Sequence, residues 1–171
     1  MKRGGALLAA ALLLAACGQG DGDGDNAAGA RLEATAIATG VVADPAAAPL
    51  DGIWSRDSDR MCIIGKDGAA KGAGRPRRIG IVLDYGEGQG CSASGLLTRD
   101  GATLGVTLGR CRFTARFDGE AIQFPASLPA ECQAFCTGRA SLSALMVERV
   151  SASAAEARTL RGPGGTPLCA D

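Results

Sequence analysis

Seven cysteines in 171 residues constrain this chain more than any other sequence feature. Cys17 stands alone near the N-terminus, directly after a run of alanines and leucines. The other six are spread over the rest of the chain: Cys62, Cys91, Cys111, Cys132, Cys136 and Cys169. An even number of cysteines in an exported chain indicates disulfides, because compartments outside the cytoplasm are oxidising. The first question is therefore whether the chain carries an export signal.

The N-terminus has the layout of such a signal. Lys2 and Arg3 precede two glycines, and residues 6–16 are eleven consecutive alanines and leucines. A basic segment followed by a short apolar segment is typical of export signals. Because a membrane-spanning helix needs about 20 residues, this run is too short to remain as a span. The sequence predicts a signal peptide over residues 1–16.

Leu14-Ala15-Ala16-Cys17 resembles the lipobox of bacterial lipoproteins, in which a branched residue and two small residues precede an invariant cysteine. The resemblance implies lipid attachment at the Cys17 thiol, cleavage after Ala16 and acylation of the new N-terminus, which together give stable anchoring. Gly18 rather than an aspartate follows the cysteine, and the enterobacterial sorting pattern then implies the periplasmic face of the outer membrane. The alternative is an ordinary secretory signal that happens to precede a cysteine.

The six remaining cysteines are expected to form three disulfides, although six cysteines can pair in fifteen ways. Our predicted pairs are Cys132–Cys136, one turn apart in a helical segment, Cys91–Cys111, and Cys62–Cys169. The last pair would close a long loop and contribute on the order of 4 kcal/mol in the chain-entropy model. Structural zinc is the competing interpretation. Because the chain has no histidine, we expect neither a metal nor a cofactor.

Composition divides the mature chain into two parts. Residues 17–49 are predicted to be the lipidated cysteine and a flexible tether, because Gly, Ala and Asp dominate and large apolar residues are too few to offset the entropy of ordering. Within this part, residues 31–42 have enough apolar content for a first strand or a helical turn. The folded domain is predicted to cover residues 50–171.

From Leu50 onward the sequence indicates short strands joined by tight turns. The expected strands are residues 52–55, 61–64, 78–85, 91–98, 102–108, 110–117 and 120–124. Residues 110–117 alternate most clearly between apolar and polar side chains, which is typical of a strand with one buried face. Phe113 and Phe117 are expected inside, and Arg112 and Arg116 outside.

The C-terminal third contains patterns typical of both helices and strands. Residues 130–136 favour a short helical turn, and residues 139–150 fit either a helix or a strand, of which we prefer the strand because the meander needs an edge partner. Ser153-Ala154-Ala155-Glu156 is a capping box that starts a helix, and Gly162-Pro163 ends it. The predicted fold is therefore mainly β: a small antiparallel β-barrel or sandwich with meander topology, a short C-terminal helix and stabilising disulfides.

The composition also limits the chemistry. Without histidine, the usual general base at neutral pH and a Ser-His-Asp or Cys-His site are missing, so we do not expect an enzyme. Once residues 1–16 are removed, 16 basic residues face 18 acidic ones, and nucleic-acid binding is not expected.

One loop is locally basic and is a candidate contact for an anionic partner. Its cations are Lys66, Lys71, Arg75, Arg77 and Arg78, against the single acid Asp67. Such a charge excess suits anionic lipid, a polyanionic glycan or an acidic protein. The alternative is a flexible solvated loop.

Leu50-Asp51-Gly52-Ile53-Trp54, with Cys62 nearby, resembles the Gly-x-Trp opening of small lipocalin-like barrels, which include periplasmic protease-inhibitor lipoproteins. The resemblance implies a barrel whose tryptophan plugs one end. Four further cysteines and a C-terminal helix depart from those inhibitors, so no inhibitory residues are carried over.

Two functions therefore remain open. One is a non-catalytic binding or interaction domain for an envelope protein or glycan, such as a hydrolase inhibitor. The other is a small-ligand carrier with a lipocalin-like pocket. An apolar cavity of roughly 300 Å³ or more would favour the carrier, and a sealed interior would favour the binding domain.

Overall fold

A computed structural model describes residues 22–65 and 75–170, which belong to two units divided after Val42. The first unit contains helix α1 (Gly22–Ala38) where a flexible tether was predicted. Alanine recurs through the C-terminal part of this helix and is the best helix former, which explains the difference. None of the helices in the described ranges is both long and apolar enough to cross a membrane.

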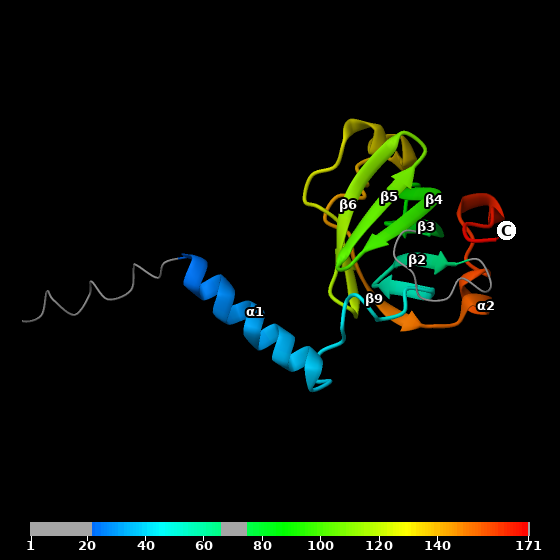
Figure 1. The fold of residues 1–171 in the computed structure, drawn as a ribbon. Helices are drawn as coiled ribbons and strands as arrows, with labels where there is room; N and C mark the ends of the chain where they lie inside the picture. The colour runs from blue at the N-terminus through cyan, green and yellow to red at the C-terminus, as the bar shows by residue number, and fades with distance from the viewer. Residues whose placement is uncertain (1–21, 66–74, 171) are drawn as a thin grey trace, which may run out of the picture. The chain divides into compact units, whose positions relative to one another are not determined.

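The second unit, from Ala43 onward, is a closed antiparallel β-barrel (Figure 1). Within the described residues its eight strands are β1 (Gly52–Arg56), β2 (Asp59–Ile64), β3 (Arg77–Asp84), β4 (Gly90–Asp100), β5 (Thr103–Leu108), β6 (Cys111–Phe117), β7 (Ala121–Gln123) and β9 (Met146–Ser151). Strands β1 to β7 pair in chain order, and β9 pairs with both β7 and β1, which closes the barrel. The predicted antiparallel meander is confirmed.

Buried and exposed side chains alternate along the strands, as the sequence predicts. On β6, Phe117 is buried while Arg112 and Arg116 are exposed. Phe113 faces the same side as Phe117 but is only partly buried, and its ring meets Phe124 edge-on at a centroid distance of 4.7 Å. The core therefore fills the barrel with the apolar face of each strand.

Strand β4 turns a corner of the barrel at Gly95. The first part of β4 pairs only with β3 and the short strand β8 (Cys136–Thr137), and the part after Gly95 pairs also with β5. A Cβ atom on Gly95 would stand 2.1 Å from the carbonyl oxygen of Thr107. Glycine therefore permits the close backbone approach that the corner requires.

The two ends of the barrel differ. We call one the arginine end, because Arg77, Arg99 and Arg149 occupy inward-facing positions there, opposite Leu97, Leu104 and Trp54 respectively. The other is the disulfide end, where the 3-10 helix η1 (Ala130–Phe135) and β8 fold across the barrel. The predicted helical turn over residues 130–136 thus forms as η1.

The six cysteines of the described residues form three nested disulfides: Cys62–Cys169, Cys91–Cys136 and Cys111–Cys132. The predicted Cys62–Cys169 pair is confirmed, whereas the predicted pairs Cys132–Cys136 and Cys91–Cys111 are wrong. The reason is the path of η1, whose cysteine meets the start of β6, while the following β8 lies in register with β4 and places Cys136 opposite Cys91.

The C-terminal segment covers the outer face of β1, β2 and β3. Helix α2 (Ala154–Ala157) begins as the capping box predicts, with the Ser153 hydroxyl accepting a hydrogen bond from the Glu156 N–H. It ends earlier than predicted, and single turns lead on to the 3-10 helix η2 (Pro163–Gly165). Leu168 and Cys169 join an apolar cluster outside the barrel. Residues 139–150 resolve as a loop followed by β9, which agrees with the preferred strand.

Candidate functional site

Residues 43–51, which we call the mouth segment, cross the arginine end before β1 begins. Ala48 and Leu50 of this segment are buried in the barrel core. The compact unit therefore starts at Ala43 rather than at the predicted Leu50. The mouth segment closes this end of the barrel with its own backbone.

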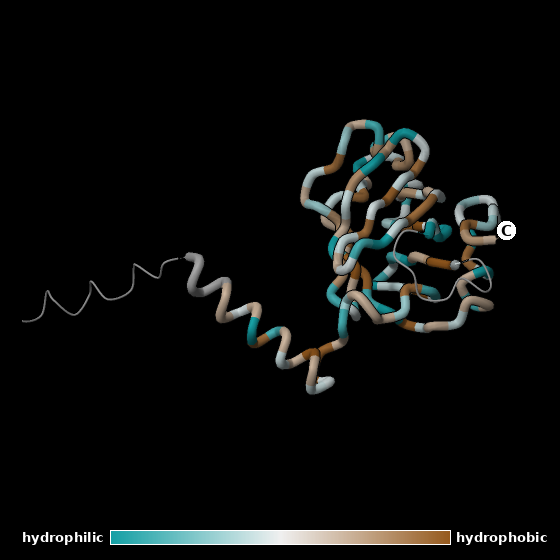
Figure 2. The backbone as a smooth tube through the Cα atoms, in the orientation of Figure 1, coloured by the Kyte–Doolittle hydropathy of each residue, from teal (hydrophilic) through white to brown (hydrophobic). Residues whose placement is uncertain are grey.

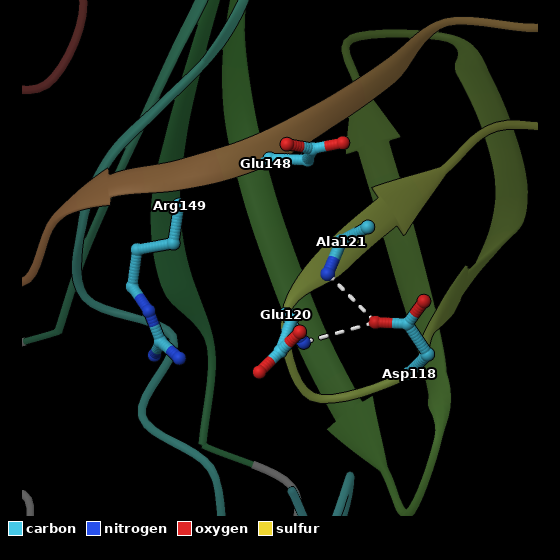
Figure 3. A pocket seen from close by; sticks show the side chains of 5 residues that line it. All are labelled: Asp118, Glu120, Ala121, Glu148 and Arg149. Atoms are coloured by element: carbon cyan, nitrogen blue, oxygen red, sulfur yellow. Dashed lines mark hydrogen bonds between the residues drawn. The ribbon is translucent and has the colours of Figure 1, made fainter. Parts of the chain in front are cut away.

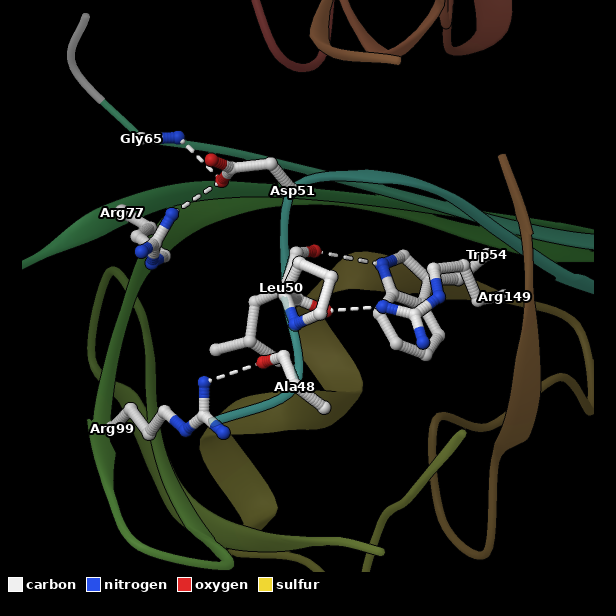
Figure 4. Close-up of polar contacts among 9 residues, drawn as sticks. Ala48, Leu50, Asp51, Trp54, Gly65, Arg77, Arg99 and Arg149 are labelled. Atoms are coloured by element: carbon white, nitrogen blue, oxygen red, sulfur yellow. Dashed lines mark hydrogen bonds and ion pairs between the residues drawn. The ribbon is translucent and has the colours of Figure 1, made fainter. Parts of the chain in front are cut away.

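Three consecutive backbone carbonyls of the mouth segment, those of residues 48–50, each accept a hydrogen bond from a side chain of the barrel (Figure 4). The donors, in chain order of the carbonyls, are Arg99 Nη1 at 2.7 Å, Arg149 Nη1 at 2.5 Å and Trp54 Nε1 at 3.0 Å. Trp54 is fully buried, and its ring meets Phe117 edge-on at 5.8 Å. Tryptophan and two arginines thus fix the mouth segment.

Asp51, the next residue of the mouth segment, also bonds to the barrel, but through its side-chain carboxylate. Its carboxylate pairs with Arg77 at 2.5 Å and accepts a hydrogen bond from the Gly65 N–H at 2.8 Å. The pair is half-exposed: the side chains of Arg77 and Asp51 are 22% and 37% accessible to solvent. Exposure therefore varies across the arrangement, from the fully buried Trp54 to this partly exposed ion pair.

The predicted basic loop is partly used inside the chain. Lys66 and Lys71 lie outside the described residues, and Arg75 is exposed. Arg77 pairs with Asp51, and Arg78 donates to the carbonyl of Ala170 at 2.8 Å, which fixes the C-terminus. Two of the five predicted cations therefore have intramolecular roles, and contact with an anionic partner stays a prediction for the loop.

Within residues 22–65 and 75–170, Arg99 has one unused hydrogen-bond donor at the arginine end. The guanidinium of Arg99 lies 5.2 Å from the ring centroid of Phe117, and its buried Nη2 has no hydrogen-bond partner among the described residues. Burial lowers the pKa of Arg99, the charge of Arg77 lowers it further, and Asp44 opposes both. Sequence reasoning missed Arg99 and Arg149, although both continue the inward phase of their strands after Leu97 and Val147.

A hollow of about 390 Å³ lies beside Arg149 (Figure 3). Its carboxylates come from Asp118, Glu120 and Glu148. Asp118 is occupied by the β6–β7 turn, because its Oδ1 accepts hydrogen bonds from the N–H groups of Glu120 and Ala121. Over residues 22–65 and 75–170, no group of three or more acidic or cysteine side chains has the geometry to hold a metal ion. The charged side chains of the hollow therefore surround a turn that Asp118 stabilises.

A larger groove of about 590 Å³ lies at the disulfide end. Its walls come from the ends of β3 and β4, from Phe135, from Thr137 of β8 and from the loop at Gly162 and Pro163. The Thr137 hydroxyl donates to the carbonyl of Gly88 at 2.7 Å and fixes the turn that borders the groove. The lining combines apolar surface with backbone polar groups, which is the usual composition of a recognition site.

The fold defines this chain as a small, closed antiparallel barrel whose ends are covered by its own segments. Comparison with protein families, curated proteins and solved structures gives no match. The resemblance to lipocalin-like inhibitors and the lipobox interpretation therefore stay predictions, and function has to be argued from the geometry.

Proposed function

We propose that this protein is an envelope lipoprotein, anchored through Cys17, whose barrel is a non-catalytic binding domain for an envelope protein or glycan. Inhibition of a hydrolase is one form that such binding can take. The observation that carries this proposal is the groove at the disulfide end, with its volume of about 590 Å³ and its mixed lining.

The groove is built for recognition by rigid elements. Cys91 lines it and is bonded to Cys136 in β8, while Cys111–Cys132 fixes η1 beside it. A preformed site loses less conformational entropy on binding than a mobile one, so more of the contact energy remains as affinity. Covalent bonds at the groove and next to it therefore favour a binding role.

The position of the groove also suits an anchored protein. The chain enters the barrel at the arginine end through the mouth segment, whereas the groove lies at the opposite end. A partner can therefore reach the groove without displacing the segment that leads to the anchor.

A small-ligand carrier is the second candidate, and the size of the groove supports it, since about 590 Å³ exceeds the 300 Å³ expected of such sites. A pocket along the barrel axis is less favoured, because buried side chains such as Trp54, Met61 and Phe117 occupy that space. The carrier would have to use the outer groove.

Site-specific photo-crosslinking in intact cells separates these functions. A photoreactive residue in place of Ser92, which lines the groove, should capture a defined envelope partner, and the same residue in place of Ser94, exposed on the same face of β4 outside the groove, should not. Native mass spectrometry of the full chain, purified in detergent, reports a small ligand instead. Identical adducts from both positions, and no bound ligand, would exclude the groove as a binding site.

The anchor has its own test. Wild-type protein should fractionate with membranes and carry a lipid mass on the peptide that begins with Cys17. The Cys17→Ser variant should be unlipidated. A freely soluble, unmodified wild-type protein would contradict the lipoprotein part of the proposal.

A further inference from the structure

Two guanidinium groups share one corner of the arginine end. Arg77 on β3 lies opposite Leu97 on β4, and Arg99 follows two residues later on the same face of β4. Diagonal neighbours of this kind on adjacent strands have Cα atoms about 7–8 Å apart. The carboxylate of Asp51 contacts Arg77, and Asp44 acts on Arg99 through its charge.

Closing the barrel mouth does not account for all of Arg99. Its Nη1 donates to the carbonyl of Ala48 at 2.7 Å, and its Nε donates to the carbonyl of Gly101 at 3.2 Å. Nη2 is buried and has no acceptor among the described residues. A charged donor left without an acceptor away from water is costly, and native proteins keep few of them. The unused donor points to an acceptor that residues 22–65 and 75–170 do not supply.

We propose that the arginine end binds a phosphate group, which Arg77 and Arg99 hold together in place of the Asp51 carboxylate. A phosphate carries a charge of about −1.5 to −2 and three acceptor oxygens, so it balances two guanidiniums where one carboxylate balances one. Arginine also presents paired N–H donors that fit phosphate geometry.

The exchange requires a local rearrangement, because Arg99 Nη2 is buried and has to become accessible to the phosphate. Arg99 keeps its bond to Ala48 through Nη1 and offers Nη2 to the phosphate. Arg77 exchanges one anion for another at a position where Asp51 is already 37% accessible to solvent. The site lies at the opposite end of the barrel from the groove, so it does not depend on the function proposed above.

Two sources present this chemistry: free phosphate and the phosphate headgroup of a lipid. Both are tested with the full chain carrying Cys17→Ser, purified in detergent. The first arm follows the arginine Nε–H signals by NMR during titration with inorganic phosphate. The second measures flotation with vesicles of phosphatidylcholine containing phosphatidic acid, against vesicles of phosphatidylcholine alone.

Three substitutions decide the result. Asp51→Asn removes the competing charge, retains an acceptor for Gly65, and should tighten phosphate binding about tenfold. Arg99→Gln removes the guanidinium that donates to the phosphate and should weaken binding by about tenfold or more. Arg112→Gln, on the exposed face of β6, is the matched control and should change nothing.

The proposal is supported if either probe binds Asp51→Asn more tightly than wild type, Arg99→Gln more weakly, and Arg112→Gln equally well. Flotation that inorganic phosphate reverses assigns the site to a lipid headgroup, and phosphate binding without flotation assigns it to free phosphate. The proposal is overturned if neither probe binds the wild-type or Asp51→Asn chains, or if Arg99→Gln leaves binding unchanged. Should Arg99→Gln fail to fold, Arg99→Lys and the shift of the wild-type Arg99 signal give the same decision.

Discussion

Arg149 lies over the ring of Trp54, with its guanidinium carbon 5.3 Å from the ring centroid, and the two side chains hold consecutive carbonyls of the mouth segment. Trp54 belongs to the first strand of the barrel and Arg149 to the last, and the two residues are partners in the pairing of β1 with β9. The seam that closes the barrel is therefore also the place where the mouth segment is fixed.

The first prediction concerns this seam. Arg149→Met keeps much of the apolar stem but leaves the carbonyls of Pro49 and Gly119 without their donor. We expect a loss of about 1–3 kcal/mol in the free energy of unfolding, because both hydrogen bonds come from a charged donor and Gly119 is buried, although Pro49 is exposed. Urea denaturation measures it, with Arg112→Met as the exposed control. Equal stability of the two variants would show that Arg149 does not hold the mouth segment.

The second prediction concerns the register of β6. Phe117→Ala should lower the free energy of unfolding by about 3–5 kcal/mol, because the ring is fully buried. Phe113→Ala should cost less, since Phe113 is partly exposed, and Arg112→Ala should have little effect. Thermal or urea denaturation ranks the three, and a larger loss from Arg112→Ala than from Phe117→Ala would refute the register.

The third prediction concerns the nested disulfides. Peptide mapping of the non-reduced protein should recover Cys62–Cys169, Cys91–Cys136 and Cys111–Cys132. The bonds span 107, 45 and 21 residues, so loss of the first should destabilise the most. The chain-entropy model gives about 4.7 kcal/mol for a loop of about 100 residues and about 3 kcal/mol for one of about 15. A peptide linking Cys132 to Cys136 would overturn this pairing.

The fourth prediction concerns pH. Asp59 has a pKa above its usual 3.8, because burial disfavours the charged carboxylate and the nearby Asp57 repels it. Protonation therefore favours the folded state: the contribution of Asp59 to stability is present below about pH 3.8 and is lost as the pH rises through the folded pKa.

Replacement of Asp59 tests this sign. Asp59→Asn should raise the melting temperature at pH 7, where the carboxylate opposes folding, and should give no gain at pH 3. Asp100→Asn, at an exposed position, serves as the control. A gain of the same size at both pH values would show that charge is not the cause.

The strands could be predicted from the sequence because alternation is a local signal. Phe117 and Arg116 differ in burial simply because neighbouring side chains on a strand point to opposite faces. The capping box at Ser153 was equally local. Two of the three disulfide pairs were not, because Cys91 meets Cys136 only after η1 has crossed the barrel end, and the spacing of the cysteines does not indicate that path.

The arginine end shows a second limit. An arginine in a strand is normally assigned to the wet face, so Arg99 and Arg149 were overlooked as inward-facing groups. Their spacing indicated the inward face, because each follows a buried residue, Leu97 or Val147, by two positions on its strand. What the sequence could not indicate is that the mouth segment lies where its carbonyls meet these arginines, because that depends on closure of the whole barrel.

The nested disulfides have a mechanical consequence. Tension applied to the N-terminal side of the chain acts first on residues 43–51, whose hydrogen bonds to Arg99, Arg149 and Trp54 share the load. If these bonds fail, β1 can be drawn out as far as Cys62, where the load divides, because the residues between Cys62 and Cys169 form a covalent ring that contains the other two disulfides. The groove at the disulfide end lies within this ring, so a pull from the N-terminus first lengthens the connection by the residues before Cys62, and the load reaches the groove divided between the two arms of the ring.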